Sequence, residues 1–229
     1  SAVGGKTAIN HELGKNMAGA FHQPEAVFYD TSFLKTLSAK EWRSGFAEAV
    51  KHALIQQPEL YDWMMNEIGS LQDLHGDCLS HVIMHGIQVK AAIVREDERE
   101  SGIREYLNFG HTLGHAIEAE LGYGKITHGE AVMVGMLFAI SLSMELKGLE
   151  FDLEEFREYV RKLGYSLEMP VDHYQALIKI MKKDKKTTGS RIRFILLERI
   201  GKPAAVELDE KELLAYMHKF LSIQEGKDD

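Results

Sequence analysis

Cysteine is nearly absent from this sequence, since Cys78 is the only one among 229 residues. A single thiol cannot form an internal disulfide, and it cannot supply the several thiolates of a cysteine-based metal cage. Secreted domains that depend on disulfides are therefore excluded. This cysteine usage is typical of a reducing compartment, and we expect a cytoplasmic location.

Dense basic clusters and long apolar runs are also lacking. The strongest basic run, Lys182–Lys186, is interrupted by Asp184, and the net charge is -8, which argues against a nucleic-acid partner. The longest apolar stretch, Ala131–Ile140, is far shorter than the roughly 20 residues of a membrane span. Ser1–Asn10 lacks the basic start and apolar core of a signal peptide. We expect a globular protein without a membrane partner.

Residues 1–30 contain many glycines and turn formers, with short β-prone pieces such as Ala26–Tyr29 between them. This composition predicts loops and short strands. The glycine pair in Gly4-Gly5-Lys6-Thr7 lacks the spacing of a Walker phosphate loop, so a P-loop is excluded.

A helical pattern begins at Ser38, which forms a predicted capping box with Glu41, and continues to Pro58. A small hairpin is predicted from Ile192–Leu197 and Ala204–Leu208. Further helices are predicted over Leu60–Ile68, Cys78–Val94, Thr112–Leu121, Ala131–Leu146, Leu153–Leu163, His173–Lys183 and Glu210–Leu221. The pattern indicates a mainly α fold, with a helical domain over residues 38–229 after a loop- and strand-rich segment over residues 1–37.

Two histidines, His111 and His115, stand four residues apart in a predicted helix and therefore share one helix face. Such a pair can bind one metal, or one metal and one substrate. The spacing also arises by chance, and His81 with His85 repeats it in this chain. The pair alone leaves these alternatives open.

His128 follows Thr127, which forms a predicted capping box with Glu130, so His128 is expected in the first turn of the apolar helix. It is either a packed histidine or a ligand held on a rigid element. Together with His111 it could supply two of the three protein ligands of a catalytic zinc site, for which a carboxylate is a suitable third.

Three charged features have a simple surface interpretation. By helical periodicity Glu48 and Lys51 lie opposite the apolar face of their helix, which predicts a solvent-exposed ion pair. The run Arg95–Glu100 with Arg104 after it is typical of a solvated helix end, and Asp184–Lys186 of a surface turn.

Read in order, six segments resemble 3-dehydroquinate synthase along nearly the whole chain: GGKTAINHELGKN, FHQP, GFAEAVKHALI, DERESGIREYLNFGHTLGHAIE, HGEAV and DKK followed by IRFILL. The resemblance implies the dehydroquinate-synthase-like C-terminal helical domain. It implies loss of phosphate from 3-deoxy-D-arabino-heptulosonate 7-phosphate, with cyclisation to 3-dehydroquinate. It also implies NAD as a catalytic cofactor and a divalent metal, usually zinc, with cobalt as a second candidate.

Residue roles follow from the same resemblance. The implied metal ligands are Glu48, His111 and His128, which supplies the carboxylate and requires the polar face of the first long helix to open on a cleft. The implied substrate contacts are Lys6, Asn16, Lys51, Lys90, Arg104, Asn108, His115 and one of Lys185 or Lys186. The implied cofactor contacts are Lys6, Lys15, Phe33, Leu34, Lys35 and Thr36. His115 would then act on the phosphate side or shuttle a proton rather than bind metal.

The complete synthases place a nucleotide-binding α/β domain before the GGKT segment and are expected to form homodimers. By this resemblance residues 1–37 are a remnant of that domain, and the chain alone is expected to be inactive. Three alternatives remain: another sugar-phosphate cyclase, such as a 2-deoxy-scyllo-inosose or valiolone-type synthase; a metal-dependent alcohol dehydrogenase of related fold; or a non-catalytic helical module. Lys185 and Lys186 after Asp184, and Asn108 ahead of His111, look more like the dehydroquinate enzyme than like other cyclases. The retained metal ligands disfavour a non-catalytic module.

Overall fold

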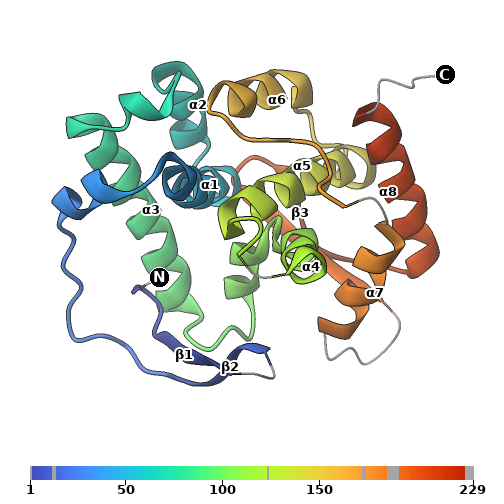
Figure 1. The fold of residues 1–229 in the computed structure, drawn as a ribbon, viewed down its shortest axis with the longest axis horizontal. Coiled ribbons are helices and arrows are strands. Elements are labelled where there is room, and N and C mark those ends of the chain that lie inside the picture. Colours follow the sequence, from blue (N-terminus) through green and yellow to red (C-terminus); the bar gives the residue numbers. More distant parts are fainter. Residues whose placement is uncertain (1, 12–13, 123, 172–173, 185–190, 225–229) are drawn as a thin grey trace.

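The computed structural model describes residues 2–11, 14–122, 124–171, 174–184 and 191–224, and within these ranges every side chain except those of residues 10, 11, 14–17, 184, 223 and 224. Most described residues are helical (Figure 1). The α-helices are α1 (Ala39–Gln56), α2 (Pro58–Glu67), α3 (Gly76–Glu96), α4 (His111–Leu121), α5 (His128–Lys147), α6 (Leu153–Lys162), α7 (Tyr174–Asp184) and α8 (Glu210–Gln224). Short 3-10 helices are η1 (Thr31–Thr36), η2 (Leu71–Asp73) and η3 (Ile103–Asn108).

Helix α5 lies at the centre of the molecule and contacts α1, α4, α6, α8 and β3 (Figure 1). Its residues from Ala131 to Ile140 are all buried, because this segment is apolar on every side and can only be stable with packing all around it. Among the described residues α5 is also the one helix long and apolar enough to cross a membrane. Its burial among the other elements identifies it instead as the core helix.

Helices α4 and α5 pack unusually closely because glycines stand at their contact. A Cβ at Gly135 of α5 would collide with the carbonyl oxygen of Gly110. Gly110 itself has φ +77° at the N-cap of α4, a conformation that favours glycine. This close approach brings the first residue of α4 and the first residue of α5 near each other.

Two antiparallel hairpins complete the described fold. Strands β1 (Lys6–His11) and β2 (Gly14–Phe21) pair with Lys6 opposite Phe21, and they lie beside the C-terminal end of α3 (Figure 1). Strands β3 (Ile192–Arg199) and β4 (Lys202–Leu208) pair with Ile192 opposite Leu208, and β3 packs against α5. The backbone N–H of Leu197 donates to Ser143 Oγ of α5 at 2.9 Å, which fixes this hairpin to the core.

The helices and the C-terminal hairpin expected from the sequence are confirmed, with ends shifted by at most three residues. Both capping boxes, Ser38 with Glu41 and Thr127 with Glu130, are present. One strand prediction is wrong, because Ala26–Tyr29 forms no strand. This piece pairs with no other strand, and β-prone side chains form a strand only with a partner to pack against. Phe28, 93% exposed, has no such packing.

Candidate metal centre and anion-binding cavity

Side chains from three helices converge at one point. Glu48 comes from the middle of α1, His111 is the first residue of α4, and His128 is the first residue of α5. Glu48 Oε1 lies 3.5 Å from His111 Nε2 and 3.7 Å from His128 Nε2. Residues far apart in the sequence therefore present one oxygen and two nitrogens to the same small volume.

The second ring nitrogen of each of these histidines has a partner. His111 Nδ1 lies 3.1 Å from the carbonyl oxygen of Phe109, so it must carry the proton of a neutral ring. His128 Nδ1 lies 2.9 Å from Oε2 of Glu118, a buried residue of α4. In a neutral imidazole these contacts leave the Nε2 lone pairs facing Glu48, the arrangement by which proteins orient histidine ligands of metals.

Glu48 is held between opposing influences. Burial disfavours its charge, but Lys51 at 2.7 Å from Oε2, with His128 and His111 adding to it, holds the pKa of Glu48 well below its ordinary value. Its other oxygen, Oε1, is buried and accepts no hydrogen bond. A buried anionic oxygen without a donor is costly, and a divalent cation between it and the two Nε2 atoms would remove that cost. The donor set therefore fits a zinc-like metal.

The pKa values of the two histidines move in opposite directions. Burial, and then the nearby charge of Lys51, lower the pKa of His111 well below its ordinary value. The carboxylate of Glu118, hydrogen-bonded to Nδ1, and then the nearby carboxylate of Glu48 raise the pKa of His128 to about 9. The carboxylates that hold this proton on His128 would equally favour a metal cation in its place.

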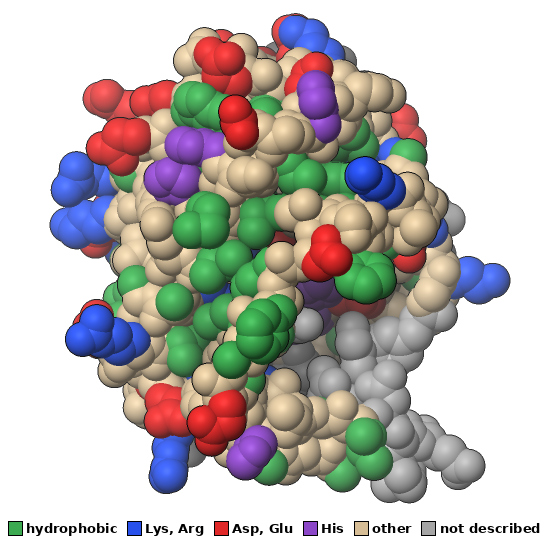
Figure 2. Space-filling model, turned by 90° about the vertical axis from the view of Figure 1, so that its left-hand side faces the viewer, with side chains coloured by type: hydrophobic (Ala, Val, Ile, Leu, Met, Phe, Trp, Pro, Cys, Tyr) green, Lys and Arg blue, Asp and Glu red, His purple; other side chains and the backbone are tan. Residues whose placement is uncertain are grey.

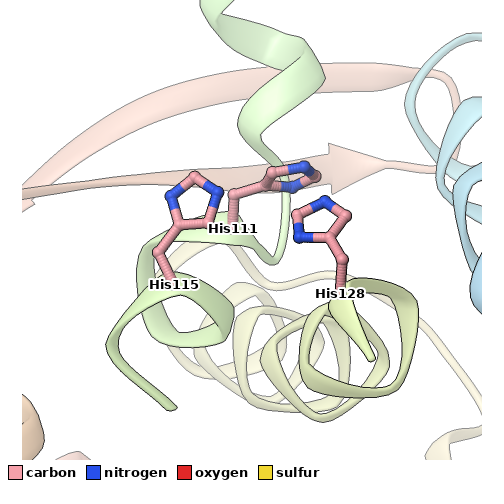
Figure 3. A group of neighbouring side chains, drawn as sticks. All are labelled: His111, His115 and His128. Carbon is pink, nitrogen blue, oxygen red and sulfur yellow. The ribbon is translucent and has the colours of Figure 1, made fainter. Parts of the chain in front are cut away.

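His115, one turn further along α4, joins the same cluster. The ligand atoms of His111, His115 and His128 all lie within 4.8 Å of one another, and Figure 3 shows His111 and His115 from α4 beside His128 from α5. The geometry thus offers two three-ligand sets, one with Glu48 and one with His115. The set with Glu48 is favoured, because Glu48 Oε1 accepts no hydrogen bond.

A cavity of about 820 Å³ has this cluster as part of its lining. Five cations and three carboxylates stand among the residues that line it: Val3, Lys6, Glu48, Lys51, His52, Lys90, Glu100, Arg104, Leu107, Asn108, His111, His115, Glu118, Ala119, His128, Ile180 and Lys183. With neutral histidines the cations outnumber the anions, so the cavity attracts a polyanionic ligand.

The substrate contacts implied by the sequence largely meet in this cavity. Its lining includes Lys6, Lys51, Lys90, Arg104, Asn108 and His115. The side chain of Asn16 and both Lys185 and Lys186 lie outside the described residues. Burial, and then Lys51, lower the pKa of Lys90, because both a loss of solvent and a neighbouring cation disfavour the charged ammonium.

One surface interpretation from the sequence is wrong, and a second is only partly right. Lys51 is only 2% exposed, because the polar face of α1 faces the cavity beside His111 and His128 instead of bulk solvent. In the charged run at the end of α3, Arg95, Glu96, Glu98 and Arg99 are exposed as predicted. Asp97 and Arg104 are instead buried, and Glu100 and Arg104 line the cavity. Arg104 is 2% exposed and donates to the carbonyl oxygens of Glu98 and, at 2.7 Å, Gly4.

The stretch Phe33–Thr36 belongs to η1. Leu34 lines a second, mainly apolar hollow of about 440 Å³, which shares Glu48, His52 and Lys90 with the larger cavity. Phe33 is 74% exposed. Figure 2 shows hydrophobic side chains gathered on the face that carries η1 and α3. The side chain of Lys15 lies outside those described.

Sequence reasoning missed four polar or charged cavity residues: His52, Glu100, Glu118 and Lys183. Glu118 carried a usable signal, since it stands seven residues after His111 and three after His115 and so shares their helix face. The other histidine pair lies elsewhere. His81 packs on His85 and on Trp63, each at a ring distance of 4.3 Å, and His85 Nδ1 lies 2.6 Å from Gln57 Oε1.

Comparison with known proteins agrees with this geometry. Residues 45–187 match the family model of the 3-dehydroquinate synthase C-terminal region, and residues 1–44 match that of its N-terminal region. The chain is 53% identical over 221 residues to a 3-dehydroquinate synthase of Geobacillus thermodenitrificans and 50% identical over 221 residues to one of Bacillus cereus. These alignments cover 96% of this chain but 60% and 61% of the two relatives.

Solved structures show the same fold. A 2-epi-5-epi-valiolone synthase from Streptomyces hygroscopicus subsp. jinggangensis, with NAD+ and Zn2+ bound, superposes with a TM-score of 0.84 at 25% identity. The superposition covers 96% of this chain and 62% of the valiolone synthase chain. A 2-deoxy-scyllo-inosose synthase complexed with carbaglucose-6-phosphate, NAD+ and Co2+ gives a TM-score of 0.82 at 25% identity, over 95% of this chain and 63% of its own.

Proposed function

The chain belongs to the 3-dehydroquinate synthase family, and we propose that it forms the metal- and substrate-binding part of an enzyme that converts 3-deoxy-D-arabino-heptulosonate 7-phosphate into 3-dehydroquinate and phosphate. It spans about 60% of the length of the curated relatives it matches. The observation that carries the proposal concerns Glu48 Oε1, which accepts no hydrogen bond and faces the Nε2 atoms of His111 and His128 in a cation-lined cavity.

We propose zinc as the metal, held by Glu48, His111 and His128, with cobalt as a substitute. Both metals occur in solved cyclases of this fold. When bound, such a metal acts as a Lewis acid that lowers the pKa of an alcohol. The chain prepares the site in advance: Phe109 and Glu118 orient the two histidines, and Lys51 keeps Glu48 ionised.

The cavity cations bind the phosphate and carboxylate of the substrate in this proposal. Lys51 and Lys90 reach it from α1 and α3, Lys6 from β1, and Arg104 from η3. Charge-assisted hydrogen bonds from such groups are short and strong, and a substrate held from several sides is oriented over the metal ligands. Asn108 and His115, which also line the cavity, add polar contacts in this proposal, and His115 exchanges a proton with the leaving phosphate.

The proposed cofactor is NAD, which the two solved cyclases named above also bind. NAD supplies oxidation and re-reduction of one carbinol when bound. In this chain η1 and Lys6 border the hollows nearest the metal ligands, and we assign the cofactor contacts Lys6 and Phe33–Thr36 to them. Lys15 is proposed as a cofactor contact from the family resemblance alone. We further propose that residues 1–37 belong with a nucleotide-binding domain, that the complete enzyme is a homodimer, and that it is cytoplasmic.

The main alternative is that the enzyme is a different sugar-phosphate cyclase, because the two solved enzymes with this fold are synthases of other cyclic products. Identity favours the dehydroquinate enzyme, at 50–53% against 25%. The many cavity cations argue against an alcohol dehydrogenase, whose substrate carries no phosphate. The oriented histidines argue against a non-catalytic module.

The test joins this chain to the nucleotide-binding domain of the Geobacillus relative and measures phosphate release with NAD in excess. We expect release from the heptulosonate phosphate and none from glucose 6-phosphate or a heptulose phosphate lacking the carboxylate. The same chimera with His111→Ala is the control and should be inactive. Preference for another sugar phosphate would reject the proposal in favour of another cyclase.

The chain without that domain is expected to release no phosphate, because positioning of the nicotinamide contributes many orders of magnitude to such a reaction. Comparable turnover by the 229 residues alone would contradict the placement of the cofactor.

A further inference from the structure

The turn between α3 and η3 is built around one carboxylate. Asp97, the C-cap of α3, is 8% exposed. It accepts hydrogen bonds from the backbone N–H groups of Ser101 at 2.9 Å, Gly102 at 2.7 Å and Arg104 at 3.0 Å. Hydrogen bonds from the Ser101 and Arg104 backbone lower the pKa of Asp97 to about 2. The charged carboxylate therefore determines the path of the chain from residue 98 to residue 104.

This turn carries side chains that line the cavity. Glu100 pairs with Lys6 and accepts from Asn108 Nδ2 at 3.2 Å. Its φ of +60° is the one positive value among the described non-glycine residues, and such a conformation lasts only where its surroundings impose it. Arg104, at the other end of the turn, donates to Gly4 at the base of the β1–β2 hairpin. One turn thus places residues of η3 and of the hairpin on the same cavity wall.

Asp97 itself does not line the cavity. We propose that Asp97 is a positioning residue for anion binding: it holds Glu100 and Arg104, and through them Lys6 and the hairpin, in the arrangement that receives the phosphate of the ligand. This inference rests on the proposed function, because it takes the cavity to be an anion site. It differs from a purely stabilising role, in which loss of Asp97 would weaken the fold without changing anion affinity at temperatures where the chain is folded.

The experiment compares Asp97→Asn with Asp73→Asn in the 229-residue chain. Asp73 is a matched control because it also caps a turn, accepting from the backbone N–H of Ser70 at 2.7 Å, and it does not line the cavity. The probe is inorganic phosphate, measured by titration calorimetry at a temperature where all variants are folded. Misplacement of binding groups by about 1 Å can weaken function up to roughly a hundredfold, and we expect Asp97→Asn to weaken phosphate binding roughly tenfold. Asp73→Asn should change it less than about twofold.

Hydrogen exchange provides the second measurement. Asp97→Asn should speed exchange in residues 98–104 and also in β1, which is joined to the turn by the Glu100–Lys6 pair and by the contact of Arg104 with Gly4 just before the strand. Asp73→Asn should leave β1 unchanged. If Asp97→Asn does not fold, Asp97→Glu, which keeps the charge one methylene further out, is compared in its place and should show the same pattern at smaller amplitude.

The outcomes separate the two claims. If the wild-type chain binds phosphate and Asp97→Asn binds it equally well, the positioning role is overturned and the proposed function stays intact. Absence of phosphate binding in the wild-type chain would overturn the anion cavity, and the positioning role would then be decided by exchange in β1. Equal effects of both substitutions would show that Asp97 only stabilises the fold.

Discussion

The carboxylate of Glu118 lies 2.9 Å from Nδ1 of His128, and the two residues come from different helices. Because α4 and α5 pack through glycines, this contact is held by rigid backbone on both sides. A carboxylate behind a histidine fixes the ring and raises its basicity, and removal of such a partner lowers metal affinity by roughly 10–100-fold.

We therefore expect Glu118→Gln to weaken zinc binding by about that factor, measured by competition with a chromophoric chelator. The matched control is Glu120→Gln, an exposed residue of the same helix, which should leave affinity unchanged. Equal affinity in Glu118→Gln and the wild-type chain would show that Glu118 does not support a metal ligand.

The ligand set itself is tested by metal content after dialysis. The wild-type chain should retain close to one zinc per chain, and His111→Ala or His128→Ala should lose it, since each removes one of three protein ligands. His81→Ala is the control because His81 packs on Trp63 away from the cavity. If His111→Ala retained zinc while His81→Ala lost it, the assignment would be wrong.

Glu48 and His115 compete for the third position. We expect Glu48→Gln to lose zinc and His115→Ala to retain it, because Glu48 Oε1 is buried and lacks a donor, whereas His115 is exposed. The reverse result would assign a three-histidine site instead. Phosphate affinity of His115→Ala, measured in parallel, tests the anion-side role of this histidine.

A charge in the core helix should be strongly destabilising. Met136 is fully buried in α5, so Met136→Asp would place a carboxylate without a partner in an apolar core. We expect a loss on the order of 3 kcal/mol or more in the free energy of unfolding in urea. Met144→Asp, at a 37% exposed position of the same helix, should cost far less. Similar costs at both positions would argue against the central placement of α5.

Acid should remove the contribution of Asp97. Its pKa in the fold is about 2, below its ordinary value of 3.8, so the charged form stabilises the folded state. This contribution is complete above the unfolded pKa and is lost as the pH falls towards 2. Urea unfolding should show wild type more stable than Asp97→Asn at pH 6, with the difference shrinking below pH about 4. A constant difference would mean that packing, not charge, sets the effect.

Much of the fold follows from local sequence. The capping boxes at Ser38 and Thr127 fix where α1 and α5 begin, and the all-round apolar character of Ala131–Ile140 identifies the core helix. These signals are local because helix ends and helix burial depend on residues within a few positions. The failed strand at Ala26–Tyr29 shows the limit, since strand formation depends on a partner that the local sequence does not specify.

The site residues likewise include some that the sequence indicated and some that only the tertiary structure revealed. Similarity to a known family pointed to Glu48, His111 and His128, but periodicity alone placed Glu48 and Lys51 on a solvated surface. Only the packing of α1 against α5, with His111 of α4 close to Glu48, turns that polar face inward and leaves Glu48 Oε1 without a donor. Likewise the charged run after α3 gave no sign that Asp97 would fold it back towards the cavity. The sequence by itself determined the helices and the core, because those depend on neighbouring residues; the tertiary structure decided which polar faces meet, because that depends on contacts between residues as far apart as Gly4 and Arg104.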